Sequence, residues 1–362
     1  MMGIFVALLV LSVLIFFHEL GHFSAARFFG VQVDVFSIGF GKKLYSRMIG
    51  KTEWSISAIP LGGYVKMKGQ DDSDPTKVSY DEDSYNVKKP WQRIIILLAG
   101  PFANFLMAFM LYFAVSQMGT YATPIFNYSK YLPATVGGFA KESPAQKIGI
   151  KKGDTILQIN HTPIANWNDL GEVTQNATTP LHIMLLRDNK RISYIMQPIV
   201  KELENKFGEK VQRKLIGISP KIPKDKFSFS FIEGVVFAWN ETLYASNLIF
   251  QSVEKMLTGA IGADKVGGII TIVDITSQAS NAGVVILFLF TALISVNLGV
   301  LNLLPIPALD GGHIMFNLYE MITGKVAGEK VMMYITMVGW AILLALMLLG
   351  LYNDITRIWG TH

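Results

Sequence analysis

Four long apolar runs divide this chain, and polar segments of very different length separate them. The runs cover residues 4–29, 94–118, 283–304 and 331–351. About 20 apolar residues in a helix cross the hydrocarbon core of a membrane, so each run is long enough to span it. The first run lacks a charged start and continues into the sequence HELGH, which favours a retained helix over a signal peptide. The pattern predicts a polytopic α-helical membrane protein with about four transmembrane helices.

The polar segment between the first two runs is rich in lysine and arginine, which predicts that it faces the cytoplasm. By parity, the N-terminus, the long segment between the second and third runs and the C-terminus then lie outside. The basic residues that carry this prediction are Arg27, Lys42, Lys43, Arg47, Lys51, Lys66 and Lys68.

The long outer segment begins with the pattern of a small soluble domain. Residues 143–170 predict a short helix, a turn, a strand and the start of another helix, and two paired strands follow around Asp188 and Asn189. From residue 227 to 279, apolar residues recur at helical spacing, which predicts amphipathic helices on the membrane surface. Packing of these helices against the soluble domain is the alternative. The internal charges disfavour a fifth span, which would invert the topology downstream.

Residues 52–69 alternate apolar and polar positions around a Pro-Leu-Gly-Gly turn. Trp54 and Ile56 precede the turn, and Val65 and Met67 follow it between lysines. This pattern predicts a β-hairpin with apolar faces. By itself, the pattern favours a peripheral hairpin on the cytoplasmic side.

Composition agrees with a membrane protein and restricts its chemistry. Of 362 residues, 51% are hydrophobic and only 16% are charged, whereas soluble domains average about 25% charged residues. The net charge of +5 is modest and no nucleic-acid motif accompanies it, so we expect no nucleic-acid partner. Cysteine is absent, so any metal must use nitrogen and oxygen ligands.

The first apolar run contains three ionisable residues, His18, Glu19 and His22. Such residues are costly inside a membrane span, so they need a common purpose. Positions i and i+4 of a helix share one face, so the two imidazoles can bind one Zn²⁺. Glu19 would lie beside the metal, where it can take a proton from an activated water. The alternative is a buried histidine pair that bonds neighbouring helices.

A third protein ligand is required, and the end of the third apolar run offers one. The sequence NLLPIPALDGGH, residues 302–313, breaks the run with two prolines and presents Asp310 before two glycines. Irregular backbone at membrane depth is tolerated where it lines a cavity, so Asp310 is the preferred ligand and His313 ranks second. Asn104, a polar residue in the second run, is expected to bond a neighbouring helix or loop. The remaining histidines, expected to be ordinary surface or packing residues, are His161, His182 and His362.

Five motifs occur along the chain in a characteristic order. They are HELGH (18–22), SIGFGK (37–42), IPLGGYVKM (59–67), GPFANF (100–105) and NLLPIPALDGGH (302–313). This set resembles the site-2 protease family of intramembrane zinc metalloproteases, of the bacterial regulator of sigma-E protease type. The resemblance covers nearly the whole chain. It implies that His18, His22 and Asp310 are zinc ligands, that Glu19 is the catalytic base, and that Asn302 handles substrate.

The resemblance also assigns roles to two further segments. It implies that residues 52–69 form a membrane-associated β-hairpin near the zinc, which binds an extended substrate as an added strand. Residues 143–170 resemble a PDZ domain, present once where some family members carry two, and KVGGIITI (265–272) replaces the usual Gly-Pro-Ile pattern. The expected substrate-binding residues of the hairpin are Gly63, Tyr64, Val65, Lys66 and Met67.

Together these observations predict a zinc-dependent intramembrane endopeptidase of the bacterial cytoplasmic (inner) membrane. It would bind one Zn²⁺ toward the cytoplasmic side, and its periplasmic PDZ domain would dock peptides or filter substrates by size. By the resemblance, it would cleave transmembrane segments of single-pass proteins, such as anti-sigma factors or remnant signal peptides, in regulated intramembrane proteolysis. A catalytically inactive membrane PDZ scaffold and a zinc transporter are the alternatives.

The sequence thus predicts eight segments. Residues 1–30, 93–119, 281–309 and 331–352 would be transmembrane helices, the first with HExxH and the third with the LDG motif. Residues 31–92 would be the cytoplasmic-side loop with the hairpin, 120–222 the PDZ domain, 223–280 the amphipathic surface helices and 310–330 a cytoplasmic loop.

Overall fold

The computed structural model describes residues 2–70, 79–123, 125–178 and 180–359. The chain divides into two compact units. The first comprises residues 1–118, 230–254 and 262–362, and the second comprises residues 119–229 and 255–261. The candidate chemistry predicted from the sequence falls in the first unit, and the predicted soluble domain corresponds to most of the second.

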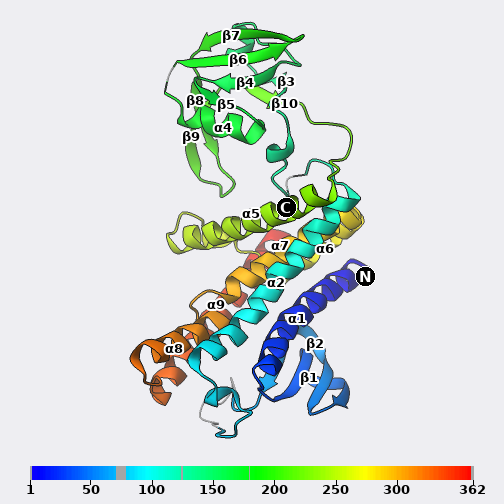
Figure 1. The fold of residues 1–362 in the computed structure, drawn as a ribbon, viewed down its shortest axis with the longest axis vertical. Helices are drawn as coiled ribbons and strands as arrows, with labels where there is room; N and C mark the ends of the chain where they lie inside the picture. The colour runs from blue at the N-terminus through cyan, green and yellow to red at the C-terminus, as the bar shows by residue number, and fades with distance from the viewer. Residues whose placement is uncertain (1, 71–78, 124, 179, 360–362) are drawn as a thin grey trace. The chain divides into compact units, whose positions relative to one another are not determined.

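The first unit is built mainly from helices, which Figure 1 labels along the chain. Among the described residues, four helices are long and apolar enough to cross a membrane, at Gly3–Phe28, Pro90–Met118, Val284–Asn302 and Lys330–Trp359. This confirms the prediction of four apolar helices. The helices are α1 (Met2–Phe28), α2 (Pro90–Met118), α5 (Phe231–Leu257), α6 (Ile269–Asn281), α7 (Val284–Asn302), α8 (Asp310–Thr323) and α9 (Glu329–Trp359).

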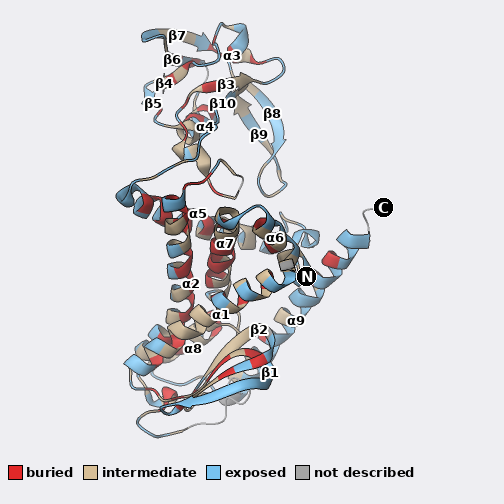
Figure 2. Ribbon diagram, turned by 90° about the vertical axis from the view of Figure 1, so that its right-hand side faces the viewer, coloured by how far each residue is buried: buried red, intermediate tan, exposed pale blue. Residues whose placement is uncertain are grey.

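Helices α1, α2 and α7 pack against one another through apolar and small side chains. Leu14 of α1 packs with Met107 of α2 and Ile294 of α7. A Cβ on Gly21 would overlap the carbonyl oxygen of Ala99, so glycine lets α1 and α2 approach closely. Figure 2 shows buried residues gathered on α2 and α7, whereas the span within α9 is only 6% buried.

The β-structure after α1 differs from the predicted hairpin. Strand β1 (Val33–Ile49) pairs with strand β2 (Thr52–Met67), and residues 35–38 lie opposite both 53–56 and 63–66. The two halves of β2, predicted to pair with each other, therefore both pair with β1. Alternation of apolar positions identifies strands but not their partners. Phe36 stacks on Trp54 with ring centroids 4.3 Å apart and so holds β1 between the two halves of β2.

The second unit contains short strands and two helices around its own apolar core. Its main sheet has the order β5-β4-β6-β7, and the pairs β3–β10 and β8–β9 are separate. Asp188 and Asn189 both have positive φ and join β6 to β7, which confirms the predicted strand pair. The elements are β3 (Val136–Phe139), α3 (Pro144–Lys147), β4 (Thr155–Ile159), β5 (Thr162–Pro163), α4 (Trp167–Asn176), β6 (Leu181–Arg187), β7 (Lys190–Met196), β8 (Ile199–Glu204), β9 (Lys210–Leu215) and β10 (Ile218–Pro220).

Two predicted segments have a different internal structure. The third apolar helix, α7, ends at Asn302, so the LDG motif belongs to the following turn and to α8. The predicted loop at 310–330 accordingly contains the 14-residue helix α8. Pro305 and Pro307 follow the end of α7. Because proline has no N–H and clashes with the preceding turn of a helix, α7 cannot continue through them, and the next helix begins at Asp310.

Candidate metal centre

Three side chains of metal-ligand type meet in the first unit. Ligand atoms of His18, His22 and Asp310 all lie within 4.8 Å of one another, and no other such cluster occurs among the described residues. The Nε2 atoms of the two histidines are 3.2 Å apart. The Oδ2 atom of Asp310 is 3.3 Å from Nε2 of His18 and 3.4 Å from Nε2 of His22. The predicted i, i+4 pair and the preferred third residue are therefore together.

His22 is oriented by the backbone of α2. Its Nδ1 lies 2.8 Å from the carbonyl oxygen of Ile96, which can only accept a hydrogen bond. The proton therefore sits on Nδ1, and the lone pair of Nε2 points into the cluster. A Cβ on Gly100 would overlap the His22 ring, so this position must lack a side chain.

His18 is oriented by an amide side chain of α2. Asn104 is fully buried, and its amide nitrogen lies 3.1 Å from Nδ1 of His18 while its amide oxygen has no donor. A half-turn of the amide exchanges the two atoms, so that the oxygen accepts the Nδ1–H and Nε2 keeps its lone pair for a ligand role. The sequence predicted a contact with a neighbouring helix or loop but missed that the partner is a candidate metal-ligand histidine.

Asp310 stands at the first position of α8, after the chain has left α7 at Asn302. The two glycines that follow it are required by packing, because a Cβ on Gly311 or Gly312 would overlap backbone carbonyl atoms of the preceding turn. Asn302 ends α7 with its amide nitrogen 3.4 Å from Nε2 of His18. His313, the second choice from sequence, does not belong to the cluster and lines a neighbouring cavity.

The residues present fit a zinc ion. The Oδ2 atom of Asp310 is buried and accepts no hydrogen bond, which is costly for a carboxylate unless a cation satisfies it. Two histidine lone pairs point at the same place. Two nitrogen ligands and one carboxylate oxygen form a set that zinc takes in catalytic sites, where a fourth position stays open.

Glu19 lies beside this cluster on the wall of a cavity of about 440 Å³. His18, Asn302 and Asp310 line the same cavity. Strand β2 also contributes to this wall. Gly63 lines the cavity, and a Cβ on Gly63 would lie 3.1 Å from Cγ of Glu19. Glu19 is therefore next to the candidate ligands without being one of them.

Comparison with known proteins matches this arrangement to one family. The model of peptidase family M50, the site-2 protease family, matches residues 6–346. The chain is 45% identical to "Putative zinc metalloprotease Cj1068" of Campylobacter jejuni over 97% of this chain and 93% of that protein. It is 38% identical to a "Putative zinc metalloprotease" of Helicobacter pylori, over 98% of this chain and 99% of that protein. A Clostridium acetobutylicum relative with the same type of name is 36% identical over 98% and 97%.

The chain belongs to peptidase family M50. The resemblance predicted from the sequence motifs is confirmed, and so is zinc as the cofactor of this M50 peptidase. Its four apolar helices and its family together identify it as a membrane protein. The HELGH, GPFANF and LDGGH motifs of this M50 chain thus contain the candidate ligands, the glycine and amide of α2 that contact the two imidazoles, and the turn that presents Asp310.

A second cavity of about 640 Å³ adjoins the first in this M50 peptidase. The two share Phe40, Gly63, Ala308 and Trp340 as lining residues. Of the predicted substrate-binding residues, the second cavity is lined by Gly63, Tyr64, Val65 and Lys66. The side chain of Met67 instead lies in the apolar core, where it is 4% exposed.

Residues 63–67 of β2 form the free edge of the β-structure, because among the described residues they have a strand on one side only. The N–H of Lys68 donates to the carbonyl of Gln32 at 2.9 Å, on the β1 side. Alternate N–H groups of a strand point to the same side. The N–H of Lys66 therefore faces β1, and the N–H groups of Val65 and Met67 face the free edge.

Proposed function

We propose that this M50 peptidase is an intramembrane endopeptidase that cleaves the transmembrane segments of single-pass proteins. The observation that carries the proposal is the position of the ligands. His18 and His22 lie within the apolar span of α1, and Asn302 ends the apolar span of α7. A peptide bond that reaches this site therefore comes from a segment at membrane depth. By resemblance, anti-sigma factors and remnant signal peptides are the substrates, in regulated intramembrane proteolysis.

The catalytic roles follow from the geometry of the side chains. His18, His22 and Asp310 hold the zinc, and Asn104 and the Ile96 carbonyl keep both imidazoles in the ligating tautomer. When bound, zinc supplies a Lewis acid that polarises a carbonyl and lowers the pKa of water. Glu19 takes the proton of the water that attacks the scissile carbonyl and delivers it to the leaving amide nitrogen. Asn302 donates a hydrogen bond to the substrate in the same cavity.

Substrate is held as an added strand on the free edge of β2. A helical peptide bond is shielded by its own hydrogen bonds, so the substrate must be extended before hydrolysis. Strand addition does this with main-chain hydrogen bonds that tolerate many sequences. The free edge supports this role because it begins at Gly63, beside Glu19, and continues along the second cavity.

A proline at Val65 tests strand addition. It removes an N–H on the free edge and leaves the pairing with β1 intact, so we expect cleavage to fall at least tenfold while zinc content is unchanged. Met67 lies two residues away and presents its N–H to the same edge, so Met67→Pro should act in the same direction. Val65→Ala keeps the backbone donor and should retain most activity. Full activity of both proline variants in folded, zinc-loaded protein would remove the edge from the mechanism.

The loop between α1 and α2 is rich in lysine and arginine, so by the positive-inside rule it would face the cytoplasm of a bacterial inner membrane. His18 lies 15 residues after Gly3, or about 22 Å along a helix, in a core of about 30 Å. This puts the active site nearer the cytoplasmic side. The second unit would then lie in the periplasm.

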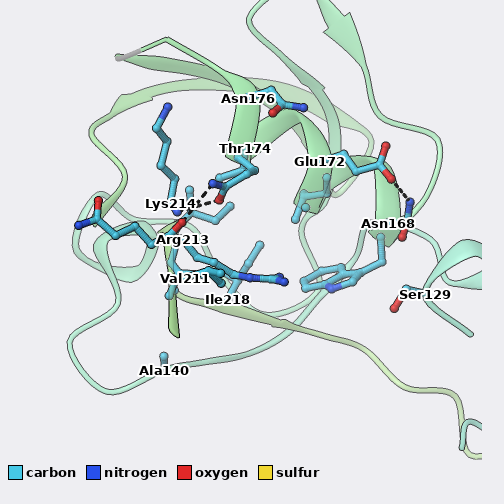
Figure 3. A pocket seen from close by; sticks show the side chains of 18 of the residues that line it. Ser129, Ala140, Asn168, Glu172, Thr174, Asn176, Val211, Arg213, Lys214 and Ile218 are labelled. Atoms are coloured by element: carbon cyan, nitrogen blue, oxygen red, sulfur yellow. Dashed lines mark hydrogen bonds between the residues drawn. The ribbon is translucent and has the colours of Figure 1, made fainter. Parts of the chain in front are cut away.

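The second unit is proposed to act as a PDZ domain that docks peptides. A cavity of about 670 Å³ between α4 and strands β9 and β10 supports this role (Figure 3). The hydroxyl of Thr174 is buried there without a hydrogen-bond partner. The Gln175 side chain bonds the carbonyl of Gln212 and the N–H of Lys214, so it covers part of the strand edge that a docked peptide would use. If Gln175→Ala does not increase peptide binding, the size-filter alternative is favoured.

The direct test of the proposed function is cleavage of a model single-pass transmembrane peptide by purified full-length protein. Zinc-loaded protein should cut within the apolar segment, and a chelator should stop the reaction. An inactive scaffold would leave the peptide intact. A zinc transporter would move zinc across a sealed vesicle without cutting, which counts equally against the proposal.

A further inference from the structure

The β-structure of the first unit has a second outer segment, on the side opposite to residues 63–67. Residues 43–49 pair with 52–57, and residues 35–38 pair with both 53–56 and 63–66. Among the described residues, 43–49 therefore have a strand on one side only. Every residue from 40 to 51 is exposed, and Figure 2 shows an exposed, pale blue stretch in β1. This second edge is thus open along most of its length.

Large apolar side chains extend from both faces of this edge. Residues 45–49 pair with 56–52 in unbroken register, so Tyr45 and Ile49 lie on one face and Met48 on the other. The exposed fractions of these side chains are 60%, 58% and 61%, and that of the adjoining Leu44 is 69%. A protein that docks on one face would leave the other uncovered, whereas lipid can cover both.

The backbone of the edge restricts its level in the membrane. An open sheet edge is not tolerated in the hydrocarbon, because nothing there bonds its unpaired N–H and C=O groups. Water alone leaves the apolar side chains uncovered. The headgroup region satisfies both, since water and headgroup oxygens bond the backbone while apolar side chains reach the acyl chains.

The charge of the segment selects the kind of lipid. Arg47 and Lys51 are exposed, and no aspartate or glutamate occurs between residues 40 and 52. Neither side chain has a hydrogen bond or an ion pair within the part of the chain that the structure describes. Each basic residue near an anionic membrane surface strengthens binding about fivefold. The segment therefore complements a negatively charged headgroup.

Two acidic residues near this segment are already paired with other lysines. Glu53 follows Lys51 by two residues and bonds Lys43 at 2.6 Å. Asp83, whose carboxylate the charge of Lys51 also reaches, bonds Lys68 at 2.7 Å. The two basic groups of the exposed segment therefore keep their charge for an anion outside the chain.

We propose that residues 44–51 dock on anionic headgroups of the membrane that the apolar helices span. Arg47 and Lys51 contact the phosphates, and Leu44, Tyr45 and Met48 reach the boundary with the acyl chains. In the proposed topology these lipids belong to the cytoplasmic leaflet. The inference rests on the membrane location of the chain and not on the proposed cleavage.

The test uses full-length protein with Ser46→Cys, one copy per lipid nanodisc. The native chain has no cysteine, so a fluorophore at this exposed position reports the segment alone. The discs contain phosphatidylcholine and increasing phosphatidylglycerol, and acrylamide in the water is the quencher. We expect the quenching constant to fall about threefold as phosphatidylglycerol rises, and high salt to weaken this response. An equal constant at every lipid composition would overturn the inference.

Paired charge removals identify the residues responsible. Arg47→Gln/Lys51→Gln should raise the phosphatidylglycerol needed for half the response at least fivefold. Lys190→Gln/Arg191→Gln removes the same charges from exposed positions of β7 in the second unit and should leave the response unchanged. A wild-type response in the first variant, or an equal loss in both, contradicts the assignment.

Pairing of the edge with a second copy of the chain is the competing occupant. Discs that hold two copies in pure phosphatidylcholine distinguish it, because edge pairing would protect the fluorophore there without anionic lipid. Protection that appears only with two copies per disc would replace the lipid by a second chain. Peptide cleavage is not the readout, so failure of this inference leaves the proposed function standing.

Discussion

Two aspartates, one in each unit, show how the surroundings of a carboxylate indicate its function. Asp154 of the second unit is 1% exposed and receives hydrogen bonds from Nε and Nη2 of Arg187, each 2.7 Å long. The N–H of Lys151 donates a third at 2.7 Å. Asp310 of the first unit has a buried oxygen that accepts no hydrogen bond and faces two histidine nitrogens. The first carboxylate is satisfied by protein alone, whereas the second requires a cation.

The same comparison holds inside the first unit. Asp354 near the end of α9 is 1% exposed and receives hydrogen bonds from the N–H groups of Gly268, Ile270 and Thr271. These are the unpaired donors at the start of α6, so Asp354 acts as a distant cap. Burial alone therefore does not mark a metal ligand. The distinguishing feature is an oxygen without donors beside imidazoles that are oriented from behind.

The largest effect is expected from replacing Asp310, compared with the same replacement of Asp154. Asp310→Ala should lower zinc occupancy and reduce peptide cleavage at least a hundredfold, because it removes one of three protein ligands. Asp154→Ala should keep zinc and activity but lower the thermal midpoint of the second unit by roughly 5–10 °C, since it leaves Arg187 without its carboxylate. Metal analysis, cleavage and calorimetry on both variants check this. Zinc loss in Asp154→Ala would break the comparison.

A smaller effect is expected from Gly100, which lies against the His22 ring. Gly100→Ala adds a Cβ where the imidazole lies, so the ring must move and zinc affinity should fall about 10- to 100-fold. Gly171→Ala is the control, because its Cβ meets nothing within 4 Å on helix α4. That variant should bind zinc normally and be slightly more stable, since alanine favours helix. Equal zinc affinity of the two variants would show that the ring is not held by α2.

The smallest effect is a pH dependence of the second unit. Burial alone would raise the pKa of Asp154, but hydrogen bonds from Arg187 and the Lys151 N–H hold it below its usual range. A lowered pKa means that the unfolded state binds the proton more readily. The stabilisation is therefore complete above pH about 4 and is lost as the pH falls through the lower, folded pKa. Hydrogen exchange in β4 and β6 should accelerate in that acid range, and Arg187→Met should reduce this dependence, with the part due to the Lys151 N–H remaining.

The sequence predicted much of this molecule because its signals are local. Apolar runs fix the four long helices, and the i, i+4 spacing of His18 and His22 fixes their common face. The turn residues Asp188 and Asn189 fix a hairpin because both adopt positive φ. Asp310 could be proposed as a ligand because it lies at the break after the third apolar run, and irregular backbone at membrane depth is tolerated where it lines a cavity.

The parts that escaped prediction depend on contacts between distant segments. Alternation in residues 52–69 does not reveal that both halves of β2 pair with β1, because pairing is decided by side chains such as Phe36 and Trp54. The role of Asn104 depends on its contact with His18, 86 residues away in sequence. The sequence predicts a cytoplasmic loop at 310–330 from the parity of the spans, which says nothing of its internal structure, and the structure has helix α8 there.

The central claim is that Glu19 acts on water beside a zinc held by His18, His22 and Asp310, without binding the metal itself. Glu19→Gln tests it most directly, because the amide keeps the size of the side chain and removes only the base. Zinc content and transmembrane-peptide cleavage should be measured on the same purified sample. The account predicts about one zinc per chain and a loss of cleavage of at least a thousandfold. Cleavage near the wild-type rate, or loss of the zinc together with the activity, would contradict it.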